Sequence, residues 1–162
     1  MSLLLALKSP AAAGAKFETL VDDFSAGSLG PEWATDGTGV TYGSGVVTLS
    51  IDLGQNNLKT VTGWDLTDSH VAGQITWPAT GNGTHQNSFR VATGSATNTS
   101  NEVRWFRDQA ANLSARYTIG GVGTTLATLT YSATDHAWLR LREAAGTVFW
   151  DTSPDGVTWT NR

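Results

Sequence analysis

Residues 136–160 read HAWLRLREAAGTVFWDTSPDGVTWT and carry the clearest strand pattern in the chain. Aromatic and β-branched residues dominate three pieces of this stretch, which suits half-buried β-strands. Turn residues separate the pieces: a three-residue loop that ends in Gly146, and then Pro154-Asp155-Gly156. The pattern predicts a three-stranded antiparallel meander.

The lengths of the two turns also predict how these strands are paired. A three-residue first loop sets Leu141 opposite Phe149. A second loop of the same size sets Ser153 opposite Val157. Because side chains alternate between the two faces of a strand, one face is predicted to be core. Its members are Leu139, Leu141, Phe149, Val157 and Trp159. The other face carries Trp138, Arg140, Arg142, Val148 and Trp150.

This Trp/Arg face, with Arg140 predicted to lie opposite Trp150, has three interpretations. Its rings can stack on a sugar while the guanidinium groups donate to hydroxyls or carboxylates. It can equally meet a protein partner, because Trp and Arg are enriched in interface hot spots. Alternatively the second sheet covers this face, so that Trp138 and Trp150 belong to the core and the arginines lie at its edge.

The composition restricts the class of protein. The chain has 162 residues, the size of one domain, and no cysteine, which excludes disulfides and thiolate metal sites. A formal net charge of -4 argues against nucleic acid as a partner, since that needs a basic surface. The 18 Gly, 7 Trp and 15% charged residues are typical of an all-β protein of extracellular type. No apolar run approaches the roughly 18 residues of a membrane-spanning helix.

Short strand-like runs separated by Gly, Asn, Ser and Thr make up the rest of the chain. With no sustained helical period, this pattern predicts an all-β, two-sheet antiparallel jelly-roll sandwich. Residues 102–107 and 113–119 are predicted to form a hairpin. In it Arg104 lies opposite Arg116, which is unfavourable unless an acid or a ligand lies between them. Either this register is wrong by one residue, or the face binds an anion.

The first 16 residues differ in composition from the rest. An apolar run contains Leu3, Leu4, Leu5 and Leu7, and an Ala/Gly-rich linker follows it. No basic residue precedes the run and Lys8 ends it early, which argues against a cleaved secretion signal. We therefore predict an extended N-terminal arm over residues 1–16, whose leucines anchor it on a neighbouring subunit, and a β-sandwich domain over residues 17–162. The alternative is a first strand packed within the chain's own sandwich.

Few residues suggest catalysis. The chain lacks a cysteine nucleophile, a Gly-x-Ser-x-Gly elbow and a phosphate-binding glycine loop. The three histidines, His70, His85 and His136, are not spaced as metal ligands. We predict no catalytic residue, no metal site and no cofactor. The one candidate for calcium is the pair Asp22 and Asp23 with loop carbonyls.

Two parts of the sequence resemble a known family. They are DDFSAGSLGPEW at residues 22–33, and WLRLR at residues 138–142 together with WDTSPDGVTW at residues 150–159. Over about residues 17 to 160 the chain is similar to concanavalin A-like lectin/glucanase sandwiches. More narrowly, it resembles modules of minor tail and other virion proteins of phages that infect actinobacteria. The apolar arm and its Ala/Gly linker are also similar to the starts of such phage proteins.

The resemblance implies a non-enzymatic virion protein, either a minor tail protein or a head-surface decoration protein. It implies a homo-oligomer that contacts other virion proteins and host-envelope glycans, on the surface of a particle assembled in the host cytoplasm. Hydrolysis is not carried over, because the Glu-x-Asp-x-x-Glu strand of the glucanases has no counterpart here. The metal residues of legume lectins have none either.

From the residue pattern, the predicted residues for ligand or partner binding are Trp138, Arg140, Arg142, Trp150, Arg104 and Arg116. The alternative to a virion protein is a soluble carbohydrate-binding module, and a third hypothesis is a glycan hydrolase.

Overall fold

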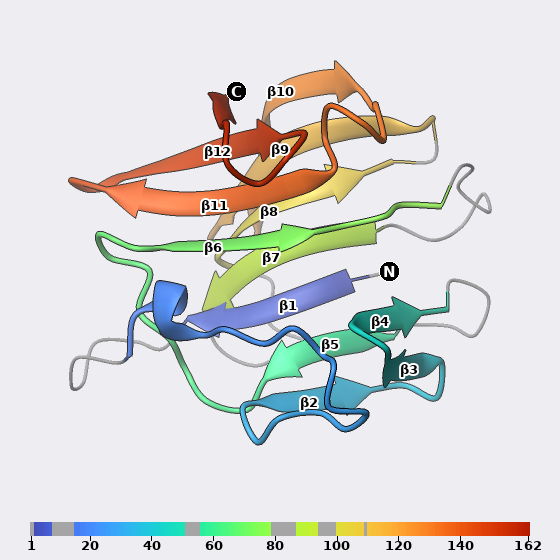
Figure 1. The fold of residues 1–162 in the computed structure, drawn as a ribbon. Coiled ribbons are helices and arrows are strands. Elements are labelled where there is room, and N and C mark those ends of the chain that lie inside the picture. The colour runs from blue at the N-terminus through green and yellow to red at the C-terminus, as the bar shows by residue number, and fades with distance from the viewer. Residues whose placement is uncertain (1, 8–14, 51–55, 79–86, 94–99, 109) are drawn as a thin grey trace.

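The computed structural model describes residues 2–7, 15–50, 56–78, 87–93, 100–108 and 110–162, and for residues 2–7 only the backbone. Within these residues the chain is all-β, with largely antiparallel sheets consistent with a β-sandwich (Figure 1). The prediction of an all-β chain is confirmed. None of the described residues belongs to a helix long and apolar enough to cross a membrane.

The strands form two sheets and a hairpin. The larger sheet contains β1 (Ser2–Leu7), β2 (Trp33–Asp36), β5 (Asn57–Thr60), β7 (Asn87–Thr93), β8 (Glu102–Arg107), β9 (Asn112–Ile119) and β10 (Val122–Thr130). The smaller sheet contains β6 (His70–Gln74), β11 (Trp138–Ala144), β12 (Thr147–Ser153) and β13 (Thr160–Asn161). The hairpin joins β3 (Val40–Gly43) to β4 (Val46–Leu49), and η1 (Phe17–Thr19) is a 3-10 turn. The spatial orders are β10-β9-β8-β7-β1-β5-β2 and β13-β12-β11-β6.

The core lies between the two sheets and is built around aromatic side chains. Trp105 on β8 and Leu141 on β11 are fully buried, and Trp150 on β12 is 5% exposed. The indole N–H of Trp105 donates to the backbone oxygen of Arg140 over 3.2 Å. That of Trp150 donates to the backbone oxygen of Arg104 over 2.9 Å. These bonds satisfy buried polar groups and join the two sheets.

The N-terminal leucine run lies inside the larger sheet instead of extending as an arm. The backbone of β1 pairs in parallel with β5 on one side and with β7 on the other, and Leu3 is in register with Leu58 and Phe89. The chain's own strands therefore pair with β1 along its whole length on the β7 side and over residues 2–4 on the β5 side. The structure supports the alternative of a first strand within the sandwich, and the expected docking arm is not seen. The linker residues 8–14 lie outside the described residues.

The predicted pairing of β11 with β12 is wrong by one residue. Leu141 lies opposite Trp150, and Arg140 lies opposite Asp151. The turn contains only Ala145 and Gly146, with φ of 51° and 80°, as in a tight hairpin turn whose two central residues both have positive φ. A shift of one residue moves every side chain of β12 to the opposite face.

This shift corrects the predicted core. Leu139 and Leu141 are fully buried as predicted, but Trp150 joins them and Phe149 lies on the outer face. Trp150 is therefore core and not part of the binding face. Val148, also predicted on the binding face, packs against the core.

The third strand of the meander begins later than predicted. β13 covers Thr160 and Asn161 and pairs antiparallel with β12, so the meander itself is confirmed. The connecting loop is longer because Asp155 holds it: its Oδ1 accepts the N–H groups of Val157 and Thr158 over 2.8 and 2.7 Å. Val157 is consequently 80% exposed and not in the core. Trp159 is partly buried on the outer face.

The hairpin of β8 and β9 has the predicted register. Arg104 lies opposite Arg116, and Trp105 lies opposite Ala115. Trp105 and Ala115 are fully buried in the core. The two arginines therefore project from the face of the larger sheet that points away from the smaller one.

Candidate functional site

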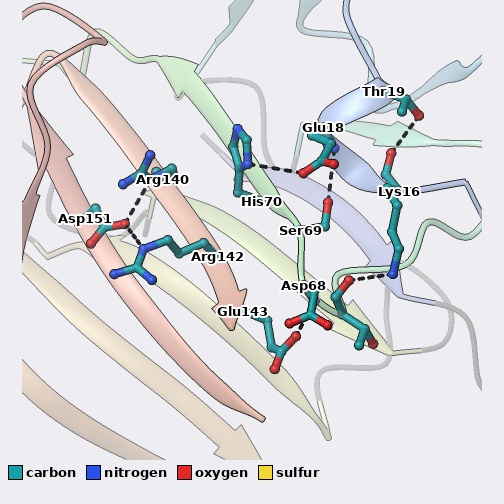
Figure 2. A network of polar contacts seen from close by, with 11 residues as sticks. Lys16, Glu18, Thr19, Asp68, Ser69, His70, Arg140, Arg142, Glu143 and Asp151 are labelled. Carbon is teal, nitrogen blue, oxygen red and sulfur yellow. Dashed lines mark hydrogen bonds and ion pairs between the residues drawn. The ribbon is translucent and has the colours of Figure 1, made fainter. Parts of the chain in front are cut away.

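The outer face of the smaller sheet carries three of the residues predicted to bind a ligand. Trp138, Arg140 and Arg142 do share this face, because they alternate with the buried Leu139 and Leu141. Figure 2 shows both arginines converging on Asp151. The Nε atoms of Arg140 and Arg142 lie 2.9 and 2.7 Å from its Oδ2.

Intramolecular contacts occupy this face. The guanidinium of Arg140 lies 4.1 Å from the ring centre of Trp159, and that of Arg142 lies 3.9 Å from that of Phe149. The loop after β12 covers Trp138 so closely that a Cβ on Gly156 would lie 3.0 Å from the indole. Each cation thus already has a carboxylate and an aromatic ring as partners. The second sheet does not cover this face, but little of its binding capacity is free.

A row of three arginines crosses the outer face of the larger sheet. Arg104 on β8 lies between Arg90 on β7 and Arg116 on β9, and each pair is directly opposite in the register. Their side chains alternate with Val91, Trp105 and Ala115, all fully buried. Like charges opposite one another on neighbouring strands are unfavourable. We call this set the arginine row.

One buried carboxylate of the described residues lies beside the row. Glu102 is two residues before Arg104 on the same strand, and its side chain is 2% exposed. Its Oε2 lies 3.3 Å from Arg90 Nη1, and its Oε1 lies 3.3 Å from Arg104 Nε. Among the described residues no acidic group forms an ion pair with Arg116. Arg104 and Arg116 therefore face each other with Glu102 on one side of the pair only, as far as the described residues extend.

An aromatic ring holds two of these side chains in place. The guanidinium groups of Arg104 and Arg116 lie 4.9 and 5.1 Å from the ring centre of Phe106, which is 6% exposed. Gly123 on β10 lies beside Arg116, where a Cβ would be in ordinary contact with its Nη2 at 3.5 Å. The row is therefore positioned by packing as well as by strand register.

The surroundings of the row disfavour the charged form of its arginines. Burial is the main cause that lowers the pKa of Arg90 and of Arg104 below the ordinary value of arginine, and Glu102 acts in the opposite direction. The positive charges of Arg116 and Arg90 lower the pKa of Arg104 further. The Nε atoms of Arg104 and Arg116 are shielded from solvent and find no aligned acceptor among the described residues. A bound anion would offset the mutual repulsion of these positive charges.

Sequence reasoning found Arg104 and Arg116 but missed two members of the site. Arg90 and Glu102 join it through the pairing of β7 with β8, two strands separated by residues 94–101. A short hairpin loop predicts register, whereas a connection of that length does not. The observed register removes the alternative that this pairing is wrong by one residue.

The remaining candidate ligands serve other roles. Asp22 and Asp23 accept the backbone N–H groups of Phe24 and Ser25 over 2.8 and 2.9 Å, as local turns. Within the described ranges, no three His, Cys, Asp or Glu residues are grouped closely enough to hold a metal ion. His136 accepts the N–H of Ser132 at Nδ1, and burial lowers its pKa.

An apolar cavity of about 440 Å³ opens between the sheets beside the turn of β11 and β12. Its walls include Val91, Val103, Tyr117, Val148 and Trp150, and Leu126 of β10 lies at the same cavity.

Comparisons of the chain with protein-family models, with curated proteins and with solved structures found no match. A function for the arginine row is therefore inferred from the residues of the row and their contacts alone.

Proposed function

We propose that the chain is a non-enzymatic protein of a phage particle, with a concanavalin A-like jelly-roll sandwich that binds a carboxylate-bearing glycan of the host envelope. One observation carries the binding part of this proposal. Arg104 and Arg116 lie directly opposite each other on neighbouring strands, and in the described part of the chain no acidic group forms an ion pair with Arg116. Two opposed guanidinium groups with one shared acid on the Arg104 side are complementary to an anion.

The chemistry of the row favours a carboxylate in particular. A guanidinium presents parallel N–H donors in a plane, which matches the two oxygens of a carboxylate. Phe106 packs beneath Arg104 and Arg116, so less side-chain entropy is lost when a ligand binds. Thr125 lies opposite Arg116 and is exposed, so its hydroxyl is available to a sugar hydroxyl.

The particle part of the proposal rests on the sequence resemblance at residues 22–33 and 138–159. In this function the protein lies on the virion surface as a minor tail or head-surface decoration protein and contacts other virion proteins. Labelling intact particles with an antibody against the purified chain tests this part. Label on the particle surface is the expected result, and particles that lack the chain contradict it.

Calorimetric titration of the protein tests the binding site. We expect saturable, salt-sensitive binding of polygalacturonate and none of neutral dextran, because only the former carries carboxylates. Inorganic phosphate serves as a third probe, and it separates recognition of a carboxylated glycan from capture of any small anion.

Two variants of similar chemistry locate the site. Arg116→Gln is expected to weaken polygalacturonate binding by about tenfold or more, since a hydrogen bond to a charged group contributes about 1.5–3 kcal/mol. Arg142→Gln is the control on the other sheet, where the cation already pairs with Asp151. Equal effects of the two variants, or no binding of polygalacturonate, would contradict the proposal. Binding of polygalacturonate by a chain that is absent from particles would favour the alternative, a soluble carbohydrate-binding module.

A further inference from the structure

β10 is a long strand at the edge of the larger sheet. It ends the seven-stranded sheet and pairs only with β9 among the described strands (Figure 1). Its nine residues, VGTTLATLT, contain neither a charge nor a proline. Native sheets usually protect such an edge with charges, proline or short strands, because the unpaired N–H and C=O groups can pair with another chain.

The other edge strands in the described part of the chain are shorter than β10. β2 has four residues and carries Asp36, which pairs with Lys59 over 2.8 Å. β13 has two residues, and β6 has five and begins at His70. The contrast singles out β10 as the edge suited to pairing.

Solvent-exposed apolar side chains lie along this same edge. Val122 and Leu126 on β10 are 71% and 55% exposed, and Ile119 at the adjacent end of β9 is 67% exposed. The register of β10 against β9 shifts between Thr125 and Ala127, so Leu126 is the extra residue of a β-bulge. The edge therefore offers both backbone hydrogen bonds and apolar area to a partner.

We propose that β10 pairs antiparallel with β10 of a second copy, which joins the two seven-stranded sheets into one. The neutral sequence favours a second copy, because a two-fold axis brings the middle of the strand against itself, and a charge near the axis would meet a like charge. A register that keeps like faces together sets Val122 opposite Leu129 of the second copy. The two bulges then meet near the axis, and the exposed Leu126 side chains become covered.

This pairing also doubles the proposed binding face. A two-fold axis perpendicular to the sheet keeps both arginine rows on one side of it. The row ends at Arg116 on β9, so three strand spacings, about 14 Å, separate it from the Arg116 of the second copy. Only this consequence rests on the proposed function, since the pairing of the edges needs no ligand.

Light scattering and sedimentation of the full chain over a wide concentration range test the pairing. We expect a species of twice the 17.1 kDa chain mass. Leu126→Lys should raise the dissociation constant by about tenfold or more, because it places two like charges near the axis. Val46→Lys is the matched control, since Val46 on β4 is 56% exposed. Circular dichroism verifies that both variants fold.

Single cysteines provide a second measurement, because the chain has none of its own. Under mild oxidation Thr125→Cys should form a covalent dimer, since residues next to the axis come within the roughly 7 Å that a disulfide allows between Cα atoms. Thr48→Cys, exposed on β4, should not.

Three results would overturn the pairing. They are a monomer at every concentration, an oligomer that Leu126→Lys leaves unchanged, and equal cross-linking of the two cysteine variants. If the Leu126→Lys monomer still binds polygalacturonate, the binding site is retained independently of the dimer.

Discussion

Trp105 and Trp150 cross the space between the two sheets in opposite directions. Trp105 extends from β8 to the backbone oxygen of Arg140 on β11, and Trp150 extends from β12 to that of Arg104 on β8. Each indole thus packs in the core and also satisfies a carbonyl on the opposite sheet. Trp150 therefore fixes the backbone of Arg104, a member of the arginine row, from the core side of the sheet.

Removal of the Trp150 indole should therefore destabilise the fold. We expect Trp150→Ala to lower the free energy of unfolding by about 3–5 kcal/mol through the cavity that it leaves. Trp150→Phe, which loses the N–H donor, should cost about 1–3 kcal/mol. Urea unfolding measures both. Val157→Ala is the control, because Val157 is 80% exposed and should change stability by less than about 0.5 kcal/mol. A cost for Trp150→Ala as small as that of Val157→Ala would exclude a core role.

Opposite effects on stability are expected within the arginine row. Glu102→Gln should lower the free energy of unfolding by about 3–5 kcal/mol, because it leaves Arg90 and Arg104 buried without their shared carboxylate. Arg116→Gln should be neutral or slightly stabilising without ligand, since it removes a like charge opposite Arg104. Thermal unfolding of both variants tests this pair of expectations. A large loss in Arg116→Gln would mean that Arg116 has a structural partner.

Asp151 should be essential to the outer face of the smaller sheet. Its side chain is 1% exposed and holds Arg140 and Arg142 together. We expect Asp151→Asn to cost about 3–5 kcal/mol, because two partly buried cations lose their counter-charge. Denaturant unfolding is the measurement, and Asp135→Asn in an exposed loop is the control. Equal stability of the two variants would disprove the role of Asp151.

Acid should weaken the loop between β12 and β13. The N–H groups of Thr158 and Val157, followed by the Ser153 hydroxyl, lower the pKa of Asp155 from 3.8 to about 2. A folded-state pKa below the unfolded one means that the ionised group stabilises the fold above about pH 4. That contribution is lost as the pH falls from about 4 to about 2. Asp155→Asn should lower the Tm at pH 7, and the difference from the native chain should shrink towards pH 2. A difference independent of pH would contradict this.

The sequence predicted the register of one hairpin correctly and that of the other incorrectly. The hairpin of β8 and β9 was predicted correctly, so the opposition of Arg104 and Arg116 followed from sequence. The β11–β12 pairing was wrong because Ala145 adopts a positive φ, which is uncommon for a residue other than glycine. If only Gly146 is expected to have a positive φ, the predicted loop is one residue too long. That error placed Phe149 in the core and Trp150 on the outer face, the reverse of the structure.

By itself, the sequence determined that this chain is all-β, that residues 136–160 contain a three-stranded meander, and that two arginines on neighbouring strands oppose each other. These are properties of local alternation and short turns, which neighbouring residues specify. Only the tertiary structure decided that Arg90 and Glu102 complete the row, that Trp150 is core, and that residues 2–7 form a central strand. Alternation defines two faces of each strand, but which face is covered depends on pairings between segments far apart in the chain.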